Sequence, residues 1–235
     1  EQNMILPFSD EEEKIYVANL AKVNEELQQL YDIEGSDKMQ ILKMLTRLRQ
    51  LCLEPRLVYD NIDQPSSKLK ACMELIKTMQ ENKQKVLLFS SFTSALDLIA
   101  EECQKAGITY YMLTGSTNKE ERRELVSRFQ KDDTTLFLIS LKSGGTGLNL
   151  TSAENVIHYD PWWNVSAQNQ ATDRAYRIGQ KSNVQVFNLV MKDSVEEKII
   201  EMQKRKKELA DMFVENNSGG LSQMSKEDIL SLFTM

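Results

Sequence analysis

The chain opens with two segments whose apolar residues repeat at helical spacing. In residues 9–31, Ser9 and Glu12 have the pattern of a capping box, and the apolar stripe consists of Tyr16, Leu20, Val23, Leu27 and Leu30. Residues 39–52 follow with a stripe of Ile41, Leu45, Leu48 and Cys52, and the pair Glu54-Pro55 ends the segment. We therefore expect two amphipathic helices that bury these stripes.

From residue 67 onward the pattern changes to short apolar runs that alternate with amphipathic segments. The apolar runs, which we predict to be strands, cover residues 86–90, 109–113, 136–141, 156–159 and 184–190. The amphipathic segments, which we predict to be helices, cover residues 67–80, 94–105, 119–130 and 165–177. Because strands that alternate with crossover helices form a mostly parallel sheet covered on both faces, we predict an open α/β fold.

The same patterns divide the chain into three predicted parts. A turn-like stretch at residues 60–67 separates a helical segment, residues 1–65, from the α/β domain, residues 66–193. Residues 194–235 form a predicted helical extension, with a long helix from residue 194 to about residue 214. A short capped helix is expected at residues 225–233, with an apolar face of Ile229, Leu232 and Phe233.

Composition and charge narrow the choice of ligand. The 41% hydrophobic and 27% charged residues exclude a disordered chain, and no apolar run is long enough to span a bilayer, so we expect no membrane partner. Three dispersed cysteines and a single histidine argue against a structural zinc site and fit a reducing compartment. The flanks 1–65 and 194–235 hold 13 basic and 21 acidic residues, whereas residues 66–193 hold 16 and 14. The net charge of −6 therefore belongs to the flanks, and an anionic ligand of the central domain is not excluded.

Polar and glycine-rich loops follow the predicted strands. In a parallel sheet these loops meet at the carboxyl edge, where small hydroxyl residues and glycines favour anions such as phosphate. The loops are 90–93, 114–117, 143–147 and 160–164. Each also has a purely structural interpretation, because Thr117 with Glu120 has the pattern of a capping box and Ser91 is a candidate helix cap.

The sharpest chemical signal lies on the predicted helix 165–177. Gln170, Arg174 and Arg177 fall on one stripe of this helix, and two guanidinium groups on one face can clamp phosphate oxygens. The alternative is a solvated face on which Asp173 pairs with Arg177. The lone His158 sits in an apolar run, where we favour a core or strand-end residue over a catalytic one.

These motifs together resemble the second motor lobe of SWI/SNF-type ATPases, within the superfamily-two helicase-like motors. Residues 170–180 resemble motif six, residues 87–92 motif four, and residues 143–150 with 160–164 motif five and its extension. Residues 45–57 and the helix from Ser194 are similar to the protrusion and brace of the same family. The sequence departs from the family pattern at Tyr176, Val165 and Leu53-Glu54, and Tyr176 leaves the role of the usual histidine open.

The resemblance implies a RecA-like lobe that closes over ATP bound to a separate first lobe and contacts duplex DNA. Arg174 and Arg177 would be arginine fingers, with Gln170, Gly147 and Asn149 near the nucleotide. The residues implied to contact the DNA backbone are Ser90, Ser91, Thr117, Arg122, Lys142, Gly144, Gly145 and Trp163. Trp163 has two open interpretations, a coupling residue between the two sites or a buried aromatic.

The chain contains neither a G-x-x-x-x-G-K-[ST] loop nor an acidic box for magnesium. We therefore expect ATP and Mg²⁺ to be held mainly by the first lobe, no metal ligands in this chain, and no ATPase activity of the isolated chain. The alternative is a non-catalytic DNA-binding or scaffold module of the same fold. A dinucleotide-binding enzyme is weakly indicated, because residues 144–147 do not match G-x-G-x-x-G. We expect a cytoplasmic, nucleoid-associated protein in a bacterium, or a nuclear one in a eukaryote.

Overall fold

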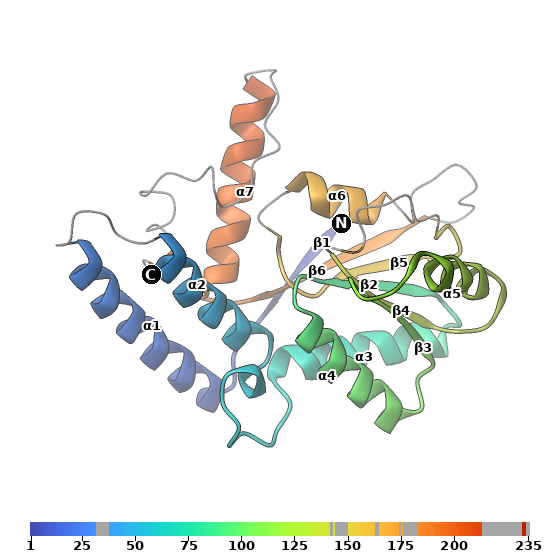
Figure 1. Cartoon of the computed structure of the whole chain (residues 1–235), viewed down its shortest axis with the longest axis horizontal. Coiled ribbons are helices and arrows are strands. Elements are labelled where there is room, and N and C mark those ends of the chain that lie inside the picture. The colour runs from blue at the N-terminus through green and yellow to red at the C-terminus, as the bar shows by residue number, and fades with distance from the viewer. Residues whose placement is uncertain are drawn as a thin grey trace. The chain divides into compact units, whose positions relative to one another are not determined.

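Figure 1 shows the computed structural model of the chain, which describes residues 1–31, 38–141, 143, 150–162, 165–173, 175, 183–212 and 232–233. The chain divides into two compact units. Residues 1–4 and 70–190 form one, which we call the sheet unit, and residues 5–69 and 191–235 belong to the other, the helical unit. The three-part division at residues 65 and 193 stays a prediction.

The sheet has six strands in the order β1-β6-β5-β2-β4-β3. Their bounds are β1 (Gln2–Leu6), β2 (Val86–Ser90), β3 (Tyr110–Leu113), β4 (Leu136–Ser140), β5 (Asn155–His158) and β6 (Gln185–Met191). The pairings of β6 with β5, β5 with β2, β2 with β4 and β4 with β3 are all parallel. The predicted α/β class is confirmed, and the five predicted strands agree with the observed ones to within one residue at each end.

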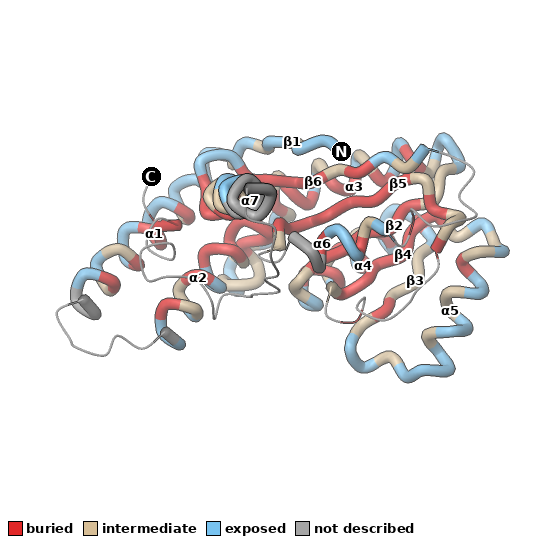
Figure 2. Tube along the Cα trace, turned by 90° about the horizontal axis from the view of Figure 1, so that it is seen from above, coloured by how far each residue is buried: buried red, intermediate tan, exposed pale blue. Residues whose placement is uncertain are grey.

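The central strands are buried on both faces. Every residue of β2, β4 and β5 is buried, which is expected when helices cover a parallel sheet from both sides (Figure 2). Alternate residues of β2 and β4, among them Leu87 and Phe137, pack in one core cluster with Phe129 of α5 and Ala171 of α6.

The described helices are α1 (Asp10–Tyr31), α2 (Lys38–Leu53), α3 (Ser67–Glu81), α4 (Thr93–Ala106), α5 (Lys119–Lys131), α6 (Val165–Thr172) and α7 (Val195–Met212), with a 3₁₀ turn η1 (Pro55–Leu57). Helix α4 ends at Gly107, whose φ of 68° lets its amide reach the carbonyls of Cys103 and Gln104. No described helix combines the length and the apolar character needed to cross a bilayer.

Two predicted features differ from the structure. The predicted helix 165–177 is shorter, because α6 ends at Thr172 and the described residues Asp173 and Ala175 lie in turns. The Ala175 amide donates to the Thr172 carbonyl three residues back, at 3.1 Å, so the four-residue spacing of α-helical hydrogen bonds ends there. The edge strand β1 is absent from the prediction, because it is short and no residue in it is fully buried.

In the helical unit, the two predicted apolar stripes form the core. Tyr16, Leu20, Val23 and Leu27 of α1 and Ile41, Leu45, Leu48 and Cys52 of α2 are all buried, at 5% exposure or less. The predicted capping box is also present: the Ser9 amide donates to Glu12 Oε2 at 2.7 Å, and the Glu12 amide to Ser9 Oγ at 3.4 Å. The amphipathic helices of the sequence are therefore confirmed.

The helical unit also contains a fully buried ion pair. Lys68 Nζ lies 2.7 Å from both carboxylate oxygens of Glu196, and the Met191 amide donates to Glu196 Oε2 at 2.8 Å. The Val195 amide, at the start of α7, donates to the Tyr16 hydroxyl at 2.8 Å. Polar groups thus join the beginning of α7 to α1 and to residue 68 inside the core.

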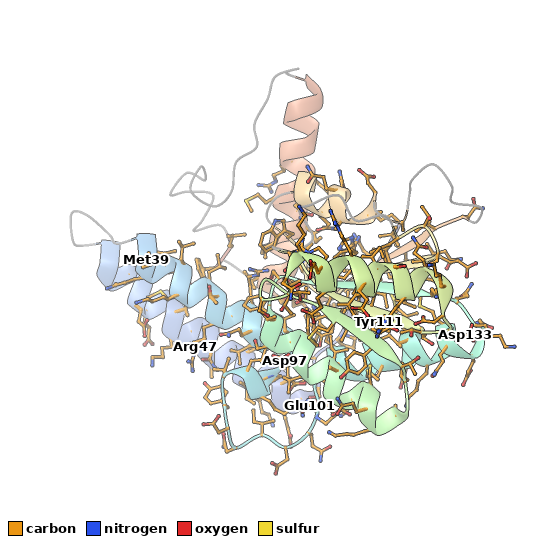
Figure 3. All side chains as sticks on the ribbon, turned by 45° about the vertical axis from the view of Figure 1, so that its right-hand side comes forward. Met39, Arg47, Asp97, Glu101, Tyr111 and Asp133 are labelled. Carbon is orange, nitrogen blue, oxygen red and sulfur yellow. The ribbon has the colours of Figure 1, made fainter. Side chains whose placement is uncertain are left out.

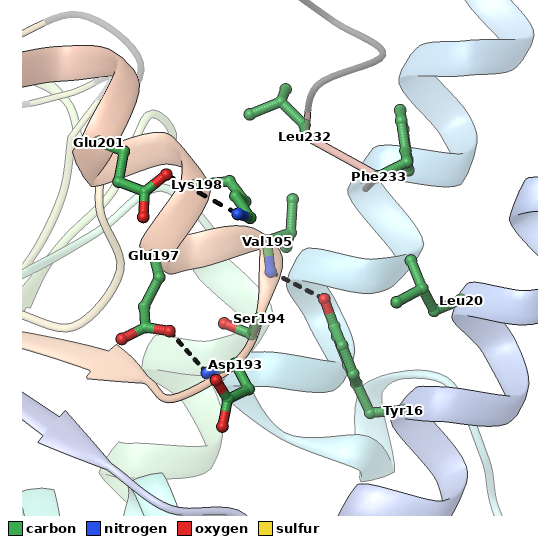
Figure 4. Close-up of a pocket in the computed structure, with 10 residues that line it drawn as sticks. All are labelled: Tyr16, Leu20, Asp193, Ser194, Val195, Glu197, Lys198, Glu201, Leu232 and Phe233. Atoms are coloured by element: carbon green, nitrogen blue, oxygen red, sulfur yellow. Dashed lines mark hydrogen bonds and ion pairs between the residues drawn. The ribbon is translucent and has the colours of Figure 1, made fainter. Parts of the chain in front are cut away.

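Next to this hydrogen bond lies a cavity of about 250 Å³ (Figure 4). Leu232 and Phe233 line it together with Leu20 and Val195, and both C-terminal side chains are buried. Their burial agrees with the apolar face predicted for residues 225–233, whose other members lie outside the described residues.

Candidate nucleotide and nucleic-acid interface

The carboxyl ends of β2, β4 and β5 lie side by side in the middle of the sheet. Ser90, the last residue of β2, pairs in register with Ser140 of β4, and Phe89 pairs with His158 of β5. The loops after these strands therefore begin at one edge, as the parallel topology requires. This edge is where an open α/β sheet places its ligands.

Asp160 organises the loop after β2. Its carboxylate is 1% exposed and accepts hydrogen bonds from Ser90 Oγ at 2.7 Å, from the Ser91 amide at 3.0 Å and from Ser91 Oγ. Ser90 Oγ also accepts from the Phe92 amide at 3.1 Å. The predicted Ser90-Ser91 pair is thus joined through one carboxylate, with Ser90 fully buried and Ser91 half-buried.

Thr117 and Arg122 stand beyond β3. Thr117 Oγ1 accepts a hydrogen bond from the Thr114 amide at 3.1 Å and so shapes the turn before α5. The cap of α5 is Asn118, whose side chain accepts from the amides of Glu120 and Glu121, so the capping box suggested for Thr117 is wrong. Arg122 is half-buried in the first turns of α5. The suggested Ser91 cap is wrong as well, since the N-cap of α4 is Phe92 and no side chain caps that helix.

Side-chain contacts of Gln168 and Thr172 hold helix α6 in place. Gln168 accepts from the Trp162 amide and donates to Asn188 Oδ1 of β6, both at 3.2 Å. Thr172 Oγ1 lies 2.9 Å from Nε2 of His158. Because both contacts face inward, Gln170 on the same helix is exposed.

Asn188 extends this network to the start of the chain. Its Nδ2 donates to Glu1 Oε1 and to Asn3 Oδ1, both at 2.9 Å. The loop 160–162, helix α6, strand β6 and the N-terminal residues are therefore connected by side-chain amides. Sequence reasoning missed this network and gave Asp160 no role. The available signal was the polar Asn188 in the apolar run 184–190.

His158 is the last residue of β5 and is 1% exposed, which agrees with the strand-end interpretation. Burial lowers its pKa to about 4, and the carboxylates of Glu1 and Asp160 oppose this only in part. The imidazole is therefore neutral at neutral pH. Its Nδ1 is buried and has no hydrogen-bond partner in the described part of the chain.

Eight of the thirteen predicted site residues lie outside the described residues. They are Lys142, Gly144, Gly145, Gly147, Asn149, Trp163, Arg174 and Arg177. The structure describes the three strand ends and helix α6, which carries Gln170. Within the described residues, no group of three or more histidine, cysteine or acidic side chains is arranged to hold a metal ion.

Comparison with known proteins identifies the family. Residues 67–179 match the family described as the helicase conserved C-terminal domain. The chain is 35% identical over 242 residues to a putative ATP-dependent helicase/translocase, YwqA, of Bacillus subtilis, covering 100% of this chain and 26% of that protein. The first curated relatives are matched over only 20% to 26% of their own length.

Two solved structures from Sulfolobus solfataricus share the fold. The SWI2/SNF2 ATPase core in complex with double-stranded DNA is 30% identical, with a TM-score of 0.78, over 98% of this chain and 49% of that one. The C-terminal domain of a SWI2/SNF2 ATPase is 25% identical, with a TM-score of 0.77, over 98% and 96% of the two chains. The family prediction is confirmed: this chain belongs to the SWI2/SNF2 family and is its helicase C-terminal domain.

Proposed function

We propose that this domain is the second motor lobe of a DNA-dependent ATPase and translocase. The observation that carries the proposal is the edge at which β2, β4 and β5 end, in a domain that matches a DNA-bound family member over 98% of its length. The edge presents the half-buried Ser91 on one loop and the exposed Gln170 on α6. In this proposal the loop with Ser91 serves DNA, and the segment that begins with α6 serves the nucleotide.

On the nucleotide side, α6 is the supporting element. Gln168 and Thr172 hold its inner face, so the segment that continues toward Arg174 and Arg177 starts from a fixed helix. In this proposal the two arginines neutralise charge on the phosphates of ATP during transfer, with Gln170, Gly147 and Asn149 beside the nucleotide. ATP and its Mg²⁺ are held mainly by the first lobe.

On the DNA side, Asp160 is the supporting residue. By fixing the Ser91 amide and hydroxyl it sets the position of the loop that follows β2. The proposed track along the DNA backbone consists of Ser91, Thr117, Arg122, Lys142, Gly144, Gly145 and Trp163. The buried Ser90 supports it by donating a hydrogen bond to Asp160. Contacts of this kind are to phosphate, so binding is independent of sequence and weakens steeply with salt.

The arginine fingers are tested in the full-length protein by Arg174→Ala and Arg177→Ala, each compared with Arg123→Ala. Arg123 is exposed on α5 and provides a matched loss of one guanidinium. DNA-stimulated ATPase activity should fall about 10³-fold for each finger variant and stay unchanged for the control. Activity within about threefold of wild type in both finger variants would refute the assignment.

The alternative of a non-catalytic DNA-binding or scaffold module has a separate test. The coding sequence upstream of residue 1 either encodes a phosphate-binding loop and an acidic box or it does not. Their presence, with DNA-stimulated ATP hydrolysis by the full-length protein, supports the motor. Duplex binding without any ATP hydrolysis supports the scaffold.

A further inference from the structure

A groove on the helical unit carries positive charge on an otherwise acidic flank. It lies between α1 and α2, has a volume of about 480 Å³, and is lined by Lys22, Lys43 and Arg47 against one carboxylate, that of Glu26. Yet the flanks 1–65 and 194–235 together hold 21 acidic and only 13 basic residues. Three cations in one groove therefore form a local region of positive charge within segments whose net charge is negative.

The central cation is held in place by its neighbours. Arg47 Nε donates to Asn19 Oδ1 at 2.9 Å, and Nη2 donates to the Tyr59 hydroxyl at 3.1 Å, with the guanidinium carbon 5.3 Å from the centre of the Tyr59 ring. Asn19 is itself fixed, since its Nδ2 donates to the Ile15 carbonyl at 2.7 Å. Because these bonds orient the guanidinium before any ligand arrives, Arg47 is a preorganised anion binder.

The donors of the groove are only partly used within the described residues. Arg47 Nη1 has no partner there, and Lys43, one helical turn away on α2, forms no ion pair in that part of the chain. Lys22 faces Glu26 at 3.9 Å, which is a weak exposed pair. Figure 3 marks Arg47 on this pair of helices.

Between its polar and charged side chains, part of the groove wall is apolar. Val23 is buried, and Met44, Leu57 and Val58 are half-buried along the same groove. Such walls fit alternating apolar and acidic side chains better than a bare phosphate backbone, which offers nothing to bury. The flanks 1–65 and 194–235 carry a net negative charge, which disfavours extended duplex DNA more than a short peptide that covers only the groove.

We propose that this groove binds an acidic peptide segment of a protein partner. Carboxylates of the segment pair with Arg47 and Lys43, and its apolar side chains cover the half-buried Met44 and Leu57. The proposal assigns a contact surface to the helical unit, and it does not depend on the nucleotide and DNA roles of the sheet unit.

The test measures fluorescence anisotropy of a labelled peptide in which glutamate alternates with leucine, titrated with the 235-residue chain. We expect saturable binding below about 100 μM. Lys43→Glu should weaken binding about fivefold or more, whereas Lys14→Glu, an exposed charge reversal on α1 outside the groove, should leave it unchanged. Arg47→Gln should weaken binding about tenfold.

The design separates the proposal from its rivals. Thermal unfolding of each variant tests whether it folds, and Lys43→Glu removes no described contact, so its result stands even if Arg47→Gln unfolds. Peptides with lysine for glutamate, or serine for leucine, should not compete. Absence of binding, equal loss in the Lys14 and Lys43 variants, competition by the lysine or serine peptides, or displacement of the peptide by an equal concentration of duplex oligonucleotide would each overturn the proposal.

Discussion

Each of the two units buries a carboxylate almost completely, and the two are satisfied in different ways. In the helical unit, Glu196 is neutralised by Lys68, with Nζ 2.7 Å from each of its oxygens. In the sheet unit, Asp160 accepts hydrogen bonds from two serine hydroxyls and one backbone amide. An enclosed ion pair fixes a core, whereas a carboxylate on hydroxyls at a strand edge positions loops. Both carboxylates are equally buried, so their different roles follow from where they lie: Glu196 in a core and Asp160 at the strand ends.

The largest expected change in stability comes from removing the ion pair between Lys68 and Glu196. Glu196→Gln leaves the Lys68 ammonium buried without its counter-charge, and the free energy of unfolding should fall by about 3 to 5 kcal/mol. Chemical denaturation of the chain measures it. Lys68→Met combined with Glu196→Leu should recover most of the loss, because it removes both charges together. A loss below about 1 kcal/mol in the single variant would show that the pair contributes little.

In the sheet unit, His158 should make stability depend on pH. Its pKa of about 4 in the folded chain lies below the unfolded value of 6.5, so its contribution is complete above pH 6.5 and is lost as pH falls toward 4. The loss amounts to about 3 kcal/mol. Chemical denaturation of wild type and His158→Gln between pH 4 and 7 isolates the contribution of His158. The free energy of unfolding should vary less with pH in the variant. Parallel curves would contradict the buried, neutral imidazole.

A smaller effect is expected when Asp160 loses its charge. Asp160→Asn weakens the hydrogen bonds from Ser90 and Ser91, so the free energy of unfolding should fall by about 2 kcal/mol. Asp173→Asn, an exposed carboxylate after α6, is the control and should change stability little. If Asp160→Asn destabilised the chain as much as Glu196→Gln, the contrast between the two carboxylates would fail.

The sequence predicted what depends on local patterns. The stripes of α1 and α2 and the five strands from Val86 onward follow from periodicity, and the capping box of Ser9 and Glu12 follows from spacing. The motif loops also predict a ligand site at the carboxyl edge of the sheet, which stays a prediction. These features need only neighbouring residues.

What the sequence could not predict depends on distant partners. The bonds from Gln168 to Asn188, and from Asn188 to Asn3, join residues far apart in the chain, so no local spacing reveals them. Strand β1 is recognisable only once β6 is present beside it. The early end of α6, where the Ala175 amide donates to the Thr172 carbonyl three residues back, follows from no spacing in the sequence either.

The smallest predicted effect separates structure from binding in the turn before α5. Asn118 accepts from two amides at the helix start, so Asn118→Ala should cost about 1 kcal/mol of unfolding free energy and leave DNA affinity of the full-length protein unchanged. Thr117→Val should lower DNA affinity, because Thr117 is one of the residues proposed to contact the phosphate backbone. Within the turn it loses only the hydrogen bond from the Thr114 amide to Thr117 Oγ1. Denaturation and salt-dependent DNA binding of both variants measure this. If Asn118→Ala weakened DNA binding and Thr117→Val did not, Asn118 and not Thr117 would be the residue of this turn that contacts DNA.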